Sequence, residues 1–85
     1  MYDYQTIKKN LFTDDGQRMF LKIRDFVNKT LEIAGAVRMQ EAINSASGDS
    51  WTMLACVDRL VELGEIVEIP QTRVAGQYRV FVKSY

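Results

Sequence analysis

The sequence contains no histidine, one cysteine and one proline among its 85 residues. The absence of histidine removes the commonest metal ligand and the commonest general base. Cys56 has no second cysteine for an internal disulfide, and no imidazole in the chain can activate it as a nucleophile. The chain also lacks a glycine-rich phosphate-binding motif and a recognisable cluster of carboxylates. We therefore expect a protein that is not an enzyme and that has no metal site and no cofactor.

The chain has no excess of charge of either sign, because eleven basic residues balance eleven acidic ones. A dedicated phosphate-binding protein usually carries net positive charge, so the composition gives no support for tight nucleic-acid binding, although it permits a local basic patch. No apolar run approaches the roughly 20 residues that span a bilayer. The first ten residues lack the apolar core of a signal peptide. Together with the single cysteine, these absences predict a cytoplasmic protein with no membrane partner.

The residues that are present indicate one small globular domain, since 47% are hydrophobic and 26% are charged. A chain of this length buries only a modest core, which favours a homodimer or larger assembly. We divide it into an N-terminal arm or short helix, residues 1–13, and a domain, residues 14–85. Tyr4, Ile7 and Leu11 have helical spacing. The arm therefore either closes one side of the domain or contacts a second copy, and the sequence leaves both open.

A long amphipathic helix is predicted from Asp14 to Gly35. Asp14 and Gln17 have the spacing of a capping box at its start, and Gly35 is a typical residue for its end. The apolar positions recur on one face of this helix, as expected for a helix that packs on a core. They are Met19, Phe20, Ile23, Phe26, Val27, Leu31 and Ala34.

Further elements follow from changes in the period of the apolar residues. We predict a short strand at 36–38, a helix at 39–46 and a helix at 50–63 that ends before Gly64. After Gly64 the pattern becomes strand-like at 66–69 and again at 78–83, with a loop between these two strands that contains Pro, Thr and Gly. The predicted core consists of Phe20, Ile23, Val27, Met53, Val57, Leu60 and Ile66.

This order of elements resembles the winged helix-turn-helix superfamily between Asp14 and Lys83. The local pattern Met53-x-x-x-Val57-x-x-Leu60-x-x-x-Gly64-x-Ile66 is similar to that around the third helix of the family. The resemblance implies an α+β fold of three helices with a C-terminal two-stranded hairpin. It also implies that residues 39–46 form the first helix of the helix-turn-helix, 50–63 the recognition helix and 70–77 the wing. The fold occurs in DNA-binding regulators and in protein-interaction modules.

Both functions have candidate residues. With Met53 taken as the core direction, the outward side of the third helix carries one arginine and two carboxylates, a poor match to the Arg, Lys, Asn and Gln that contact base edges. We therefore expect a DNA-binding transcriptional regulator of this kind to bind mainly phosphates. The candidate DNA contacts are Arg59, Arg73, Arg79, Lys83, Lys8, Lys9 and Thr52.

The alternative is a protein-interaction domain that docks a partner through the outward face of the third helix. Trp51, Ala55 and Arg59 form this candidate face, and tryptophan is enriched at interface hot spots. Trp51 is equally well explained by packing against the wing or the arm. The sequence leaves the two functions open.

Overall fold

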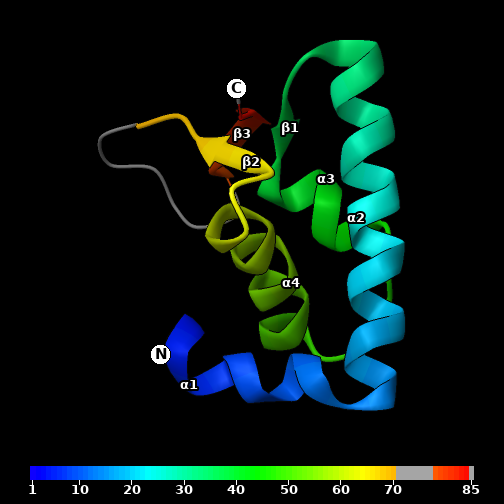
Figure 1. The fold of residues 1–85 in the computed structure, drawn as a ribbon, viewed down its shortest axis with the longest axis vertical. Coiled ribbons are helices and arrows are strands. Elements are labelled where there is room, and N and C mark those ends of the chain that lie inside the picture. Colours follow the sequence, from blue (N-terminus) through cyan, green and yellow to red (C-terminus); the bar gives the residue numbers. More distant parts are fainter. Residues whose placement is uncertain (71–77, 85) are drawn as a thin grey trace.

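The computed structural model describes residues 1–70 and 78–84, and the predicted wing at 70–77 therefore lies almost wholly outside the described residues. Helices pack against one small antiparallel sheet whose strand order is β1-β3-β2 (Figure 1). The α+β class is confirmed, and the layout is compatible with a winged helix. The elements are α1 (Tyr4–Ile7), the 3-10 helix η1 (Lys8–Phe12), α2 (Asp14–Ala34), β1 (Val37–Arg38), α3 (Met39–Asn44), α4 (Ser50–Glu62), β2 (Ile66–Glu68) and β3 (Val80–Lys83).

The long helix α2 has the predicted length but a different cap. Thr13, with extended backbone, is the N-cap, and its hydroxyl oxygen accepts a hydrogen bond from the Gly16 N–H at 3.0 Å. Gln17 donates its side-chain amide to the Leu11 carbonyl oxygen instead of closing a capping box. The predicted box at Asp14 is wrong because that residue already lies in the first helical turn. At the other end Gly35 has a φ of 79° and terminates the helix as predicted.

The predicted C-terminal hairpin is present, and the short strand β1 joins it as a third strand. Ile66 pairs with Lys83 and Val67 with Val82, while Val37 pairs with Phe81. Side chains alternate between the two faces of a strand. Phe81 is fully buried, so its side chain lies on the face of the sheet that packs against the helices. Its neighbours Val80 and Val82 lie on the opposite face.

The core lies between α2, α4 and the inner face of the sheet. Six of the seven predicted core residues are buried, with relative exposures of 8% or less. Phe20 is the exception: it is only partly buried, because it lies at the edge of the core beside a surface cavity. The core also includes buried residues that are not among these seven: Leu11, Val37, Met39, Ala42, Ala55, Cys56 and Phe81.

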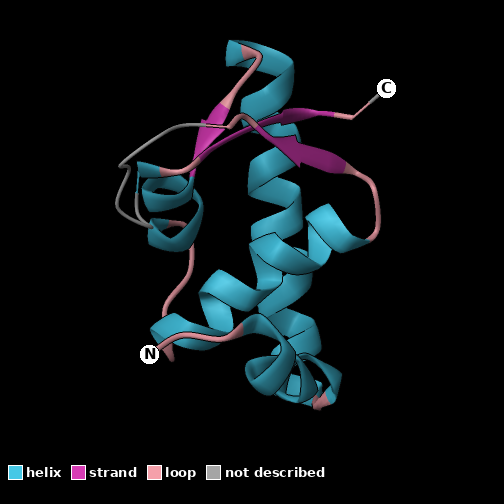
Figure 2. Cartoon of the chain, turned by 90° about the vertical axis from the view of Figure 1, so that its left-hand side faces the viewer, coloured by secondary structure: helices cyan, strands magenta, loops and turns pink. Residues whose placement is uncertain are grey.

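The N-terminal arm is an integral part of the domain. It is helical, lies beneath α4 and the first turns of α2, and contacts both (Figures 1 and 2). Leu11 is 1% exposed and extends the core into the arm. The close approach requires glycine at position 16, since a Cβ there would lie 2.0 Å from the Asn10 carbonyl oxygen. The arm thus forms a short helix that closes one side of the domain, and its contact with a second copy stays a prediction.

Candidate functional site

The predicted outward face of α4 is largely covered. Thr52 is 6% exposed and Ala55 is 0% exposed, so the prediction that these two side chains face outward is wrong. The physical reason is the arm, because small side chains at these positions let α1 and η1 approach α4 closely. The Thr52 hydroxyl donates to a carboxylate oxygen of Asp49 at 2.7 Å and accepts from the side-chain amide of Asn10 at 3.4 Å.

The acidic residues of α4 hold the arm in place. The Tyr2 hydroxyl donates to Asp58 Oδ2 at 2.7 Å, and the Tyr4 hydroxyl donates to Glu62 Oε1 at 2.8 Å. Lys8 Nζ lies 2.9 Å from the second oxygen of Glu62. These are the two carboxylates on the predicted outward side of the third helix, and they are occupied by the protein's own N-terminal arm.

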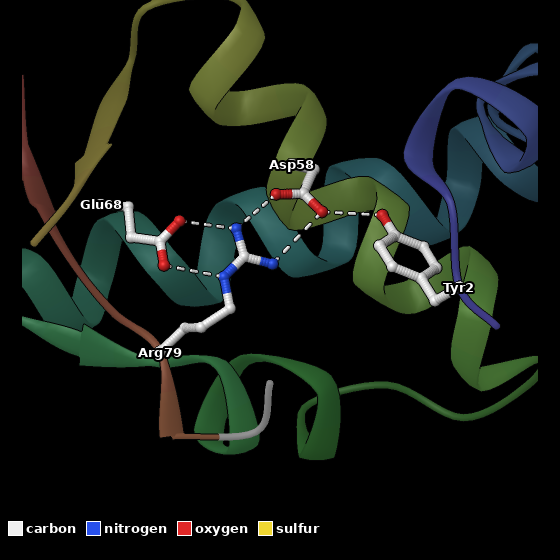
Figure 3. Close-up of polar contacts among 4 residues, drawn as sticks. All are labelled: Tyr2, Asp58, Glu68 and Arg79. Carbon is white, nitrogen blue, oxygen red and sulfur yellow. Dashed lines mark hydrogen bonds and ion pairs between the residues drawn. The ribbon is translucent and has the colours of Figure 1, made fainter. Parts of the chain in front are cut away.

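Arg79 is the centre of a polar network that joins the sheet to α4 (Figure 3). Its guanidinium donates to Asp58 Oδ1 at 2.7 Å and to Glu68 at 2.8 and 3.0 Å. The same guanidinium stacks 5.2 Å from the centre of the Phe81 ring. The side chain is only 23% exposed. Arg79 therefore lies between two carboxylates under the sheet and does not project from it.

Three groups of the contact between the arm and α4, the side chains of Tyr2, Tyr4 and Glu62, have pKa values far from neutral pH. Burial, together with the hydrogen bond to Asp58, raises the pKa of the Tyr2 hydroxyl far above its usual value. Partial burial and the contact with Glu62 raise the pKa of Tyr4 to about 12. Hydrogen bonds from Lys8, Arg59 and Tyr4 lower the pKa of Glu62 to about 2. None of these three groups titrates near pH 7, so none of them is poised for general acid–base chemistry.

The remaining candidate DNA contacts do not form one basic surface. Arg59 and Lys8 both form ion pairs with Glu62. Lys9 and Lys83 are exposed, but they lie on η1 and β3, at opposite ends of the molecule in Figure 1. Arg73 lies outside the described residues.

The three residues of the predicted protein-docking face do not form one exposed surface, because the middle one is buried. Ala55 is buried, and Trp51, 44% exposed, lies in the first turn of α4. Arg59 lies two turns further along, with its guanidinium carbon 5.5 Å from the centre of the Phe12 ring. Arg59 therefore belongs to a different surface, which lies next to η1.

That surface is an apolar notch where η1, α2 and the end of α4 meet. The notch is a cavity of about 230 Å³ lined by Leu11, Phe12, Gln17, Phe20, Arg59 and Leu63. Phe12 is 60% exposed and Leu63 is 47% exposed, whereas Leu11 beneath them is buried. The sequence analysis did not select Phe12. Its position directly after Leu11 was the available signal, because adjacent residues of a helix project about 100–120° apart, so that Phe12 turns toward the edge of the core when Leu11 points into it.

Comparisons with known proteins identify no relative. No protein-family model matches the chain, and neither a curated protein nor a solved structure matches it. Within the part of the chain that the structure describes, no helix is both long and apolar enough to cross a membrane. In the same residues, no group of three or more potential ligand side chains is arranged to hold a metal ion. The function proposed below therefore rests on the geometry of the notch and of the polar network.

Proposed function

We propose that this chain is a non-enzymatic, winged-helix-type protein-interaction domain that binds its partner at the apolar notch between η1, α2 and α4. The observation that carries the proposal is the pair of large apolar side chains, Phe12 and Leu63, that are exposed and line the same cavity as the buried Leu11. Exposed apolar groups around a depression are a common feature of protein-binding surfaces. The guanidinium of Arg59 stacks on Phe12 at the same place.

The geometry favours this function over DNA binding. In the winged-helix resemblance α4 would be the recognition helix, but the arm covers much of its outer side. The cations expected to contact phosphates at Arg59, Arg79 and Lys8 are paired with carboxylates of the same chain. Phosphate contacts by these side chains would first require breaking those pairs.

The shape and charge of the notch define the kind of partner. A cavity of about 230 Å³ has room for one large aliphatic or aromatic side chain. The polar groups at its rim are the neutral amide of Gln17 and the paired guanidinium of Arg59, so an uncharged side chain fits best. We therefore expect a protein segment, such as an amphipathic helix, that inserts one apolar anchor. Burying such an anchor contributes roughly 1.5–3 kcal/mol.

The test begins with a photo-reactive amino acid at position 63 to identify the protein bound in the notch. The purified partner is then titrated against the wild type, Phe12→Ala and the control Ile33→Ala, since Ile33 is an 88% exposed residue near the end of α2. We expect Phe12→Ala to weaken binding by at least about tenfold, as for an interface anchor, and the control to have no effect.

A parallel titration against random duplex DNA at low salt addresses the alternative function. We expect no saturable binding. Equal affinity of the partner for wild type and Phe12→Ala would overturn the proposed site. Saturable, salt-sensitive DNA binding that is lost when Lys9 and Lys83 are both changed to alanine would overturn the proposed function.

A further inference from the structure

Glu62 connects the N-terminal arm to the notch. It is the last residue of α4, and its carboxylate has three donors. The Tyr4 hydroxyl donates to Oε1 at 2.8 Å, and Lys8 Nζ lies 2.9 Å from Oε2. Arg59 Nη1 donates to Oε1 at 2.5 Å, and the same guanidinium stacks 5.5 Å from the centre of the Phe12 ring, which lines the notch. One carboxylate therefore contacts both the arm and the cation at the rim of the notch.

The contact with the arm stabilises the pair of Glu62 and Arg59. Two opposite charges three residues apart on an exposed helix attract each other only weakly, because water screens them and both side chains are mobile. Here the carboxylate also accepts hydrogen bonds from Tyr4 and Lys8, whose backbone lies in α1 and η1. The buried Leu11 anchors η1 in the core. The arm thus restricts the position of the carboxylate, and the carboxylate restricts the position of the guanidinium.

This pairing decides which charge the notch presents to a partner. The described residues that line the cavity include one cation, Arg59, and no carboxylate. An unpaired guanidinium at this place would attract an anionic group of the partner. Paired with Glu62, the guanidinium presents no net charge, because the field of a close pair of opposite charges falls off much faster than that of a single charge.

We propose that Glu62 determines the specificity of the notch for uncharged groups, and that the arm controls this specificity by holding Glu62 in place. The inference rests on the proposed function and concerns the regulation of the same site. Glu62 is a positioning residue, because it acts through Arg59 and does not itself line the cavity. When the contacts of the arm with Glu62 are broken, Arg59 can pair with an anion, and the notch accepts an apolar group that carries a negative charge.

The test compares two small probes that have nearly the same shape and differ in charge, phenylacetamide and phenylacetate. Each probe is titrated into the full chain at low salt, and the backbone amide shifts of Leu11, Phe12 and Leu63 in NMR spectra report binding at the notch. The wild type should prefer the amide. Glu62→Gln should shift the ratio of the two dissociation constants toward the anion by about three- to tenfold, as expected for an unpaired charge at a partly solvated surface.

Two controls separate this effect from a change in net charge. Asp25→Asn removes one carboxylate from the exposed ion pair with Lys29 on α2, and should leave the ratio as in the wild type. In an Arg59→Gln background, Glu62→Gln should shift the ratio much less, because the carboxylate acts through the guanidinium. Thermal melts show which variants are folded.

The role of the arm is tested with the double variant Tyr4→Phe and Lys8→Met, which removes two donors to Glu62 and keeps the apolar parts of both side chains. The ratio should again move toward the anion, by less than in Glu62→Gln because the pair with Arg59 can still form. Loss of the Lys8 charge alone would favour the amide, so net charge cannot explain such a shift. The pKa of Glu62, which these donors help to lower to about 2, should rise toward its usual 4.5. A merely structural role of the arm would lower the Tm and leave the ratio unchanged.

The outcomes separate this inference from the proposed function. A wild type that prefers the anion, or an unchanged ratio in Glu62→Gln while the amide still binds, would overturn the inference and leave the notch as a binding site. A shift in Glu62→Gln without one in the arm variant would overturn control by the arm. If neither probe shifts the notch residues in any variant, the notch does not bind apolar groups, and the proposed function fails together with the inference.

Discussion

Replacing Gly16 with alanine sets two physical effects against each other. Gly16 lies in the first turn of α2 and its φ is not positive, so backbone conformation alone would favour alanine by about 1 kcal/mol. The structure predicts instead that alanine at this position destabilises the fold. The new Cβ would lie 2.0 Å from the Asn10 carbonyl oxygen and 2.8 Å from the Leu11 Cα, and both of these are backbone atoms that cannot rotate away. η1 would have to move by about 1 Å, carrying the buried Leu11 with it.

Overpacking of this kind costs roughly 1–3 kcal/mol, part of which the helix propensity of alanine offsets. We expect a net loss of about 1–2 kcal/mol, which for a domain of this size lowers the Tm by about 4–16 °C. Urea and thermal denaturation measure it, with the exposed Asn28→Ala on the same helix as the control for propensity. In a Leu11→Ala background the cost of Gly16→Ala should shrink, because less core is displaced. A Gly16→Ala protein that is more stable than the wild type would refute the argument.

Three further predictions follow from the core and the polar network. Leu60→Ala removes a fully buried side chain and should lower the free energy of unfolding by about 2–5 kcal/mol, seen as a lower urea midpoint; an unchanged midpoint would contradict its place in the core. Glu62 has a folded pKa of about 2, below its ordinary 4.5, so its stabilising effect is present above pH 4.5 and is lost as the pH falls toward 2. The Tm difference between wild type and Glu62→Gln should therefore shrink toward zero as the pH falls from 4.5 to about 2. Arg79→Ala leaves Asp58 without its guanidinium partner and should cost about 1–3 kcal/mol, less than a fully buried pair because both side chains keep some exposure. A double-mutant cycle with Tyr2→Phe should be non-additive, since both residues contact the same carboxylate.

The sequence was most informative where one period dominated a long segment. α2 was predicted almost to the residue, because its apolar stripe is regular and Gly35 ends it. The hairpin followed from the change of period after Gly64. On β3 the alternation could not show which face is buried, because Val80 and Val82 on one side and Phe81 on the other are all apolar. Only packing against the helices decides that Phe81 lies inside.

The candidate site was less predictable, because it depends on what the N-terminal arm covers. The spacing of Tyr4, Ile7 and Leu11 indicates a helix but does not say which surface it meets. Once the arm lies against α4, Ala55 becomes core and Phe12 becomes the edge of a cavity. Such long-range contacts leave little trace in a single sequence, apart from small residues where two segments approach closely, as at Gly16 and Ala55.

The distribution of charge gives the most general reason for preferring apolar recognition. Basic and acidic residues balance in the chain, and the described part pairs most of its basic side chains with its own carboxylates. Asp58 and Glu62, which on an uncovered α4 would repel a nucleic acid, instead anchor the arm and Arg79. Because these charges act within the domain, the recognition that we propose at the notch draws its binding energy from buried area. Contacts of that kind depend little on salt, in contrast to phosphate contacts, whose affinity falls steeply as salt rises.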